Sequence, residues 1–171
     1  AVMNGTATHV PLGLIPGPVH DRMAALSRTQ DWMGWAGYLS PSVLDTTEFE
    51  YFAIRNQATL FDISPMHKYR ISGPGALAML NRLVRRDVAC IAPGRVGYVM
   101  WCDEEGMVID DGTLFRLSEQ EFRLCCQEPM FRWLTDAAWG FDAHVTDESH
   151  TIAGLSLQGP TAFSVLAAAG I

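Results

Sequence analysis

The stretch VGYVMWCDEEGMVIDDGTLFRLSEQEFRLCCQ, residues 96 to 127, decides the fold. It contains three segments rich in aromatic and β-branched residues: VGYVMWC, MVIDDGTLFRL and FRLCCQ. Two short polar turns, DEEG and SEQE, separate them. Apolar runs joined by polar loops of about two to five residues are typical of antiparallel strands. The stretch therefore predicts three consecutive strands of an antiparallel sheet.

Helical patterns lie on both sides of these strands. Residues 73 to 84 begin with Gly-Pro-Gly and then carry apolar side chains at helical spacing, which residues 129 to 139 repeat. Two strand-like segments, TLFDISPM and KYRISG, precede the first helix. The order of elements from residue 59 to 139 predicts an α+β unit with helices on one face of an antiparallel sheet.

The outer parts of the chain are expected to be more varied. Residues 1 to 18 are rich in Gly and Pro and predict an N-terminal arm. Helices are predicted from about residue 20 to 29 and from 45 to 56. The segments DAHVTD and AGLSLQG predict strands, and an apolar helix follows from residue 160 to 170. Because nothing in the sequence follows to cover that helix, we expect the chain to be a fragment or to require a partner surface.

The composition is that of a globular protein, with 49% of the 171 residues hydrophobic and 18% charged. The net charge of −7 and the lack of a basic cluster beyond Arg85–Arg86 argue against nucleic-acid binding. No apolar run approaches the roughly 18 residues of a membrane span, and no secretory signal pattern is visible. The four cysteines show neither CxxC nor metal-ligand spacing. A cytoplasmic protein without a metal is expected.

Two adjacent carboxylates, Asp110 and Asp111, interrupt the middle strand of the opening stretch. Alternation along a strand places Asp110 on one face with Arg116 and Asp111 on the other. The other members of the Asp111 face are Met107, Ile109, Thr113, Phe115 and Leu117. On so apolar a face, Asp111 is interpreted as a desolvated ligand carboxylate. The alternative is a turn, in which Asp111 ends the strand beside Gly112.

Several separated segments then resemble the glycine cleavage T-protein family, over roughly residues 30 to 170. They are TLFDISPMHKYRISGPGALAML, RDVACIAPGRVGYVMWCDEEGMVIDDGTLFRLSEQEFRL and LSLQGPTAFSVL. The family comprises aminomethyltransferases and tetrahydrofolate-dependent demethylases. The resemblance implies half of a three-domain fold. A ferredoxin-like domain would occupy residues 59 to 139, and residues 19 to 58 and 140 to 171 would form parts of the first α+β folate-binding domain.

The resemblance also implies a set of site residues. Asp111 matches the second acid of the family's Asp-Asp pair and would lie near N5 of tetrahydrofolate. Met66 and Tyr98 would line the pterin pocket. Cys125 and Gln127, two residues apart on one strand face, would also point toward the cofactor.

The sequence departs from the family pattern at several of these places. Pro65 and His67 flank Met66 unusually, Gly112 stands where the family usually has Leu, and Gln127 replaces an Asn. The aromatic segment WMGWAGYLSP would lie on the side of the donor substrate, where a methylated cation could contact its rings. Core packing with a turn is the alternative for these aromatic residues.

The implied activity is the transfer of a methylene or methyl group from a methylated or aminomethyl donor to N5 of the folate. Asp111 would position N5 and stabilise positive charge there. This part of the fold is expected to be inactive alone, because half of the folate cavity would be missing. The alternatives are a folate-binding relative without activity and a module that docks a carrier protein or another partner.

Overall fold

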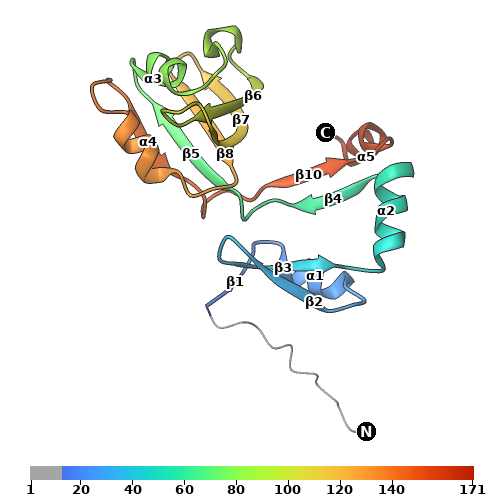
Figure 1. Ribbon diagram of the computed structural model, residues 1–171. Coiled ribbons are helices and arrows are strands. Elements are labelled where there is room, and N and C mark those ends of the chain that lie inside the picture. Colours follow the sequence, from blue (N-terminus) through green and yellow to red (C-terminus); the bar gives the residue numbers. More distant parts are fainter. Residues whose placement is uncertain (1–12) are drawn as a thin grey trace, which may run out of the picture. The chain divides into compact units, whose positions relative to one another are not determined.

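The computed structural model describes residues 13–171, which form two compact units (Figure 1). Unit 1 contains the chain up to Pro65 together with Ala153–Ile171, and unit 2 is Met66–Ile152. These bounds differ from the domain bounds expected from the sequence. The strand beginning at Thr59 pairs within unit 1, and the strand beginning at His144 pairs within unit 2.

Unit 2 is built on one five-stranded antiparallel sheet, in the order β6-β7-β8-β5-β9. Its strands are β5 (His67–Ser72), β6 (Arg95–Cys102), β7 (Val108–Ser118), β8 (Glu121–Cys126) and β9 (His144–Asp147). Its helices are α3 (Ala76–Leu83), the 3-10 turn η1 (Val88–Cys90) and α4 (Phe131–Ala137). Strands β7-β8-β5-β9 with α3 and α4 have the ferredoxin-like arrangement, and β6 extends the sheet by one edge strand. The predicted α+β class is confirmed.

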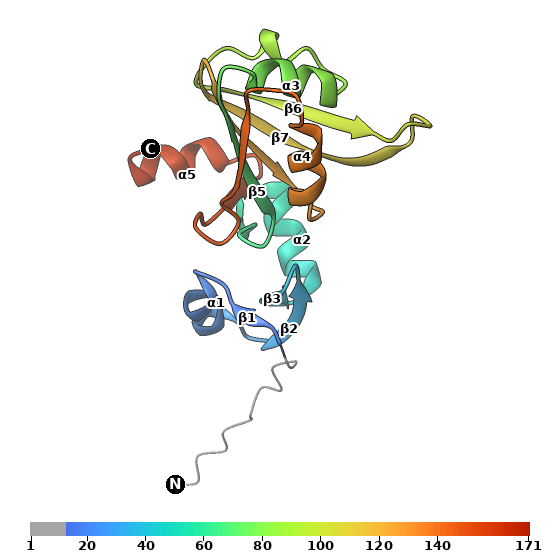
Figure 2. The ribbon, with the colours of Figure 1, turned by 90° about the vertical axis from the view of Figure 1, so that its left-hand side faces the viewer.

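The hydrophobic core of unit 2 lies between α3 and α4 and one face of this sheet (Figure 2). Helix α3 contributes Met79 and Leu80, and α4 contributes Leu134, each at most 1% exposed. The strands contribute alternate residues, which are Tyr69, Ile71, Val99, Trp101, Leu114, Phe122, Leu124, Cys126 and Val145. The period of two along each strand therefore assigns one covered and one open face to the sheet.

Unit 1 contains two smaller sheets. Strands β1 (Ile15–Pro16), β2 (Asp31–Trp35) and β3 (Tyr38–Val43) pair in the order β1-β3-β2, and β4 (Thr59–Asp62) pairs antiparallel with β10 (Leu155–Gln158). The helices of the unit are α1 (His20–Leu26), α2 (Thr47–Asn56) and α5 (Ala162–Ala169). The predicted arm falls mainly on residues 1 to 12, which lie outside the described residues, whereas Ile15–Pro16 forms β1.

Local signals explain two elements of unit 1. Helix α2 begins where the side chain of Thr46 accepts a hydrogen bond from the Phe49 amide, which is the usual role of a threonine at a helix N-cap. The aromatic segment forms the β2–β3 hairpin, whose turn residues Ala36 and Gly37 have φ values of 46° and 83°. Two positive φ values in succession match the twist that a tight hairpin requires. None of the described helices is long and apolar enough to cross a membrane.

Candidate functional site

Tyr98 and Asp111 meet on the open face of the unit 2 sheet. Strands β6 and β7 pair Tyr98 with Thr113 and Met100 with Asp111, so Tyr98 and Asp111 are diagonal neighbours across the ladder. The Tyr98 hydroxyl donates a hydrogen bond to Oδ2 of Asp111. Among the described residues, Oδ1 of Asp111 has no hydrogen-bond partner. One carboxylate oxygen is therefore held by Tyr98, and the other is unpaired within the described residues.

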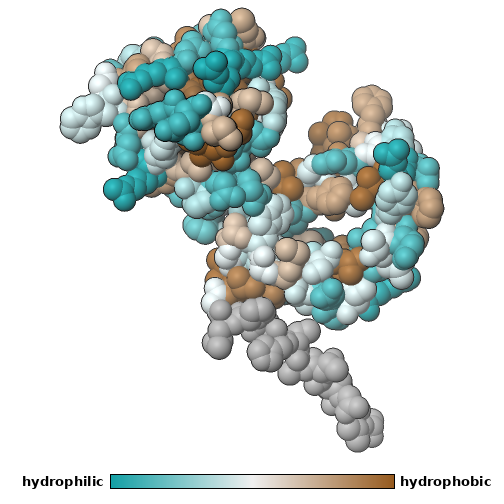
Figure 3. All heavy atoms as spheres, in the orientation of Figure 1, coloured by the Kyte–Doolittle hydropathy of each residue, from teal (hydrophilic) through white to brown (hydrophobic). Residues whose placement is uncertain are grey.

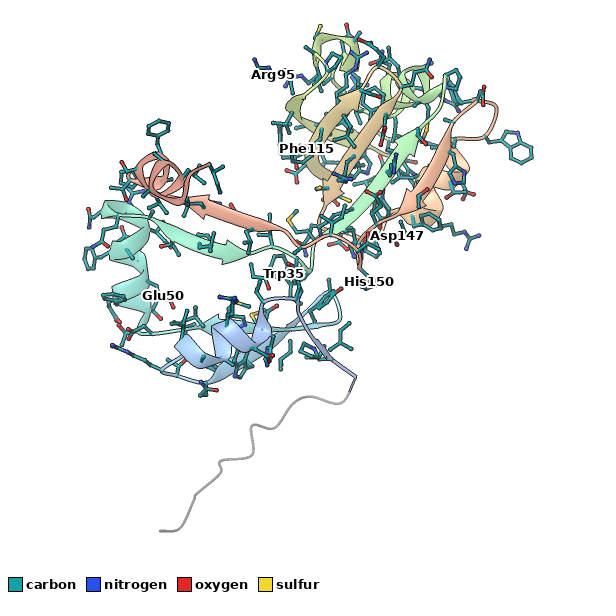
Figure 4. All side chains as sticks on the ribbon, turned by 180° about the vertical axis from the view of Figure 1, so that it is seen from behind. Trp35, Glu50, Arg95, Phe115, Asp147 and His150 are labelled. Carbon is teal, nitrogen blue, oxygen red and sulfur yellow. The ribbon has the colours of Figure 1, made fainter. Side chains whose placement is uncertain are left out.

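The structure corrects the expected burial of Asp111. Its face is apolar, as predicted, but it is the face that α3 and α4 leave uncovered, and Asp111 is exposed. Neighbouring exposed residues on this face are Val96, Tyr98, Met100, Phe115 and Leu117. The side chain of Phe115 extends from the sheet in Figure 4. The alternative of a turn is wrong, because β7 continues from Val108 to Ser118 through Asp111.

Asp110 is the more constrained of the two acids. Its Oδ1 accepts a hydrogen bond from the Asp111 amide at 2.8 Å, and its Oδ2 accepts one from the Glu128 amide at 2.9 Å. The carboxylate thereby connects β7 to the loop after β8. Asp110 therefore ties down the end of the sheet, whereas Asp111 beside it is exposed.

The hydrogen bond between Tyr98 and Asp111 also determines the protonation of the phenol. Donation to a carboxylate favours the neutral phenol, so this hydrogen bond, followed by partial desolvation and the negative charge of Asp111, raises the pKa of Tyr98. Tyr98 therefore remains a donor at all physiological pH values, and its ring stands beside Asp111 as a flat apolar surface.

Cys125 lies on the same open face, one strand further into the sheet. It pairs with Thr113 of β7 on one side and with Lys68 of β5 on the other. Burial is the main cause that raises the pKa of the Cys125 thiol, and the neighbouring Lys68 lowers it by a smaller amount. Cys125 is therefore a neutral, weakly polar neighbour of the Tyr98–Asp111 pair, and not a thiolate nucleophile.

Lys68 is a residue of this site that sequence reasoning missed. It is only 4% exposed, and its Nζ donates a hydrogen bond to the Met66 carbonyl at 2.8 Å. A buried lysine is uncommon unless it is paired. The alternating segment KYRIS, read in register with Cys125, could have placed it on the open face.

Met66 and Gln127 lie at one end of the neighbouring strands. Met66 directly precedes His67, which pairs with Cys126, and Gln127 directly follows Cys126, which also pairs with Gly112. Both residues therefore lie at the end of the sheet where Asp111 lies. Met66 is half-buried and Gln127 is exposed, and no hydrogen bond joins Gln127 to Asp111.

The other half of the open face is charged and internally paired. Arg123 Nε lies 2.9 Å from Oε2 of Glu148, and Arg70 lies 2.5 Å from Glu121 and 3.7 Å from Glu148. The register sets Phe115 opposite Arg123 and Arg123 opposite Arg70, so the charged region borders the apolar one. Figure 3 shows hydrophobic residues lying among hydrophilic ones at the molecular surface. Within residues 13–171, no group of three or more His, Cys, Asp or Glu side chains could hold a metal ion.

Comparisons with known proteins identify the family of the chain. The family model of the GCVT N-terminal domain matches residues 19–170. The chain belongs to the glycine cleavage T-protein family. It is 36% identical over 153 residues to an aminomethyltransferase of Geobacillus thermodenitrificans, a match that covers 87% of this chain and 40% of the relative. It is 34% identical over 155 residues to that of Streptomyces coelicolor, covering 85% and 42%.

A solved structure of the T-protein family has the same fold. The crystal structure of glycine cleavage system aminomethyltransferase T from Bartonella henselae matches with a TM-score of 0.77 and 30% identity. That match covers 92% of this chain and 44% of the other. The chain thus spans about two-fifths of the length of the relatives that it matches.

At position 112 this T-protein chain has a glycine where the usual residue is leucine, and the structure explains why a glycine is needed. A Cβ atom at Gly112 would lie 2.2 Å from the Cys125 carbonyl oxygen, closer than any real contact. The glycine allows β8 to approach β7 next to Asp111 and Cys125. The close approach of β7 and β8 beside two of the candidate site residues therefore depends on this glycine.

Proposed function

We propose that this chain supplies the N5 side of a tetrahydrofolate site in a protein that transfers a methylene or methyl group from a methylated or aminomethyl donor. The observation that carries the proposal is the Tyr98–Asp111 hydrogen bond on an exposed, apolar sheet face. Membership of the T-protein family supports it, since curated relatives are named aminomethyltransferases.

The open face has the properties that a reduced pterin ring requires. Such a ring is flat, with apolar faces and hydrogen-bonding nitrogens at its edge. Tyr98, at 54% exposure, and Met100, at 37%, offer apolar surface beside the carboxylate of Asp111. Polar groups placed singly on an apolar wall are typical of cofactor sites. The residues present therefore fit the cofactor.

Bound tetrahydrofolate would supply a nucleophilic N5 that accepts and releases the one-carbon unit. Asp111 Oδ1, which has no partner among the described residues, would accept a hydrogen bond from N5–H or face positive charge at that position. Tyr98 would hold Asp111 in this orientation through Oδ2. Lys68, by binding the Met66 carbonyl, would fix the backbone of the pterin-lining Met66.

The role of Asp111 is tested by Asp111→Asn in the intact protein that carries this chain. Transfer of label from a panel of methylated amines and an aminomethylated carrier to tetrahydrofolate should fall by at least about a hundredfold, the usual effect of removing a positioned charge in a transition state. Binding of tetrahydrofolate, measured by calorimetry, should be retained. Asp110→Asn serves as the neighbouring control and should keep activity wherever the variant is folded.

The same measurements separate the proposal from its alternatives. A wild-type protein that binds tetrahydrofolate but transfers from no donor in the panel would indicate a binding relative without activity. A melting temperature unchanged by tetrahydrofolate but raised by a partner protein would indicate a docking module. Equal activity of Asp111→Asn and wild type would remove Asp111 from the reaction.

A further inference from the structure

A groove of about 770 Å³ lies on the helix side of unit 2, separate from the open face that carries Asp111. It is bounded by α3, by α4 and by the turn between β6 and β7. Helix α3 lines it with Met79, Arg82 and Leu83, and α4 lines it with Trp133, Asp136 and Ala137. Both sets have the spacing i, i+3 and i+4, so each helix presents one continuous face to the groove.

The floor and the walls of the groove are apolar. Leu83, Ile109, Trp133 and Ala137 are half-buried and pack against the core of unit 2, so they are fixed in place. The Trp133 ring stacks on Trp101 of β6 with 6.3 Å between centroids. Two helix faces thus flank an apolar floor, which is the kind of surface that binds an amphipathic helix in a groove.

The rim of the groove is strongly acidic. Asp103, Glu104, Glu105 and Asp136 line it, all exposed, and among the described lining residues the one cation is Arg82. Asp136 also lies 4.0 Å from the exposed Arg132 outside the groove. The guanidinium of Arg82 lies over the Phe141 ring, 5.7 Å from its centroid, and so contacts the protein itself. The acidic turn has a defined shape, because Asp103 accepts a hydrogen bond from the Met107 amide at 2.8 Å and the Gly106 amide bonds to the Asp103 carbonyl at 3.1 Å.

We propose that this groove docks an amphipathic helical segment of a partner protein, with apolar side chains on one face and lysines or arginines beside them. The apolar floor would contact the partner's apolar side chains, and the carboxylates of the β6–β7 turn and of α4 would pair with its lysines or arginines. Charge complementarity of this kind selects the partner and fixes its orientation in the groove. The groove is distinct from the folate site, because its lining residues do not include Tyr98, Asp111 or Cys125; Ile109, expected by alternation on the Asp111 face, packs on the core side instead, beyond the register shift between β6 and β7.

The test uses a synthetic amphipathic helical peptide of leucine and lysine as the probe, with a scrambled peptide of the same composition. Binding to the chain is followed by fluorescence anisotropy of the labelled peptide. The amphipathic peptide should bind at least about tenfold more tightly than the scrambled one, because only it presents a continuous apolar face. Equal affinity of both peptides would indicate mere attraction to an acidic protein and would overturn the proposal.

Two variants locate the binding. Glu104→Lys/Glu105→Lys reverses two exposed charges of the turn, and Ala137→Arg fills the groove from α4; each should weaken binding about tenfold. Asp21→Lys/Glu48→Lys, with the same charge change elsewhere, should change affinity less than about twofold. Unfolding curves verify that each variant folds. Wild-type affinity in both groove variants contradicts the proposal.

Discussion

The two faces of the unit 2 sheet are similar in sequence and opposite in environment. Adjacent residues of β7 illustrate the contrast: Leu114 is 0% exposed under the helices, whereas Phe115 on the open face is 38% exposed. The acids differ in the same way, since Asp110 bonds two backbone amides and Asp111 bonds only the Tyr98 hydroxyl through its carboxylate. One face of the sheet is packed in the core, and the other is exposed.

The largest difference between the faces is expected for truncation of apolar side chains. Leu114→Ala should lower the free energy of unfolding by about 3 kcal/mol, because it leaves a cavity in a packed core. Phe115→Ala should lower it by less than about 1 kcal/mol, because the ring is already partly solvated. Urea unfolding of both variants measures the difference. Equal losses would mean that the open face is covered in solution.

A smaller effect is expected for Gly112, which lies on the covered face of β7. Gly112→Ala should destabilise the chain by about 2 kcal/mol, since the new methyl group would push against the Cys125 carbonyl oxygen and separate β7 from β8. Thr113→Ala, one residue further on, is the matched control and should cost less than about 1 kcal/mol. Amide hydrogen exchange of β8 should accelerate in Gly112→Ala only. Unchanged exchange there would contradict the close approach.

The two acids provide the third contrast. Asp110→Ala should cost about 1 to 2 kcal/mol, because the amides of Asp111 and Glu128 lose their acceptor. Asp111→Ala should stay within about 0.5 kcal/mol, as is usual for exposed side chains. Thermal unfolding of the two variants, which differ by one position, makes the comparison directly. A greater loss of stability in Asp111→Ala would show that Asp111, and not Asp110, has the structural role.

The sequence predicted the strands and helices of unit 2 well, because their periods are strong and their turns are polar. It could not decide which face of β7 the helices cover. The covered face contains Gly112 and Arg116, which look unsuited to a core. Arg116 is nevertheless 7% exposed, because its guanidinium bonds the Ile91 carbonyl at 2.9 Å and Glu119 at 2.7 Å, and its position over the Phe122 ring hides its stem.

The candidate site, like the fold of unit 2, was predictable from the sequence only in part. Alternation separated Asp110 from Asp111, and the resemblance assigned Asp111 the ligand role that remains the proposal. The Tyr98–Asp111 hydrogen bond depends on the register of β6 against β7. That register depends on the bulge near the turn between the two strands, which the sequence does not reveal. Lys68 was missed for the same reason, since its proximity to Cys125 depends on pairing between strands far apart in the chain.

The smallest expected effect concerns the pKa of Tyr98. The folded-state pKa is raised by the hydrogen bond to Asp111, so this contribution to stability is complete below the ordinary tyrosine pKa of about 10 and is lost as pH rises through the folded value. Asp111→Asn should lower the pKa of Tyr98 toward the ordinary value. Titration of tyrosinate absorbance, with Tyr98→Phe subtracted to isolate this phenol, measures the shift. If Asp111→Asn leaves that titration unchanged, the phenol and the carboxylate are not paired in solution, and the open face holds Asp111 by other means.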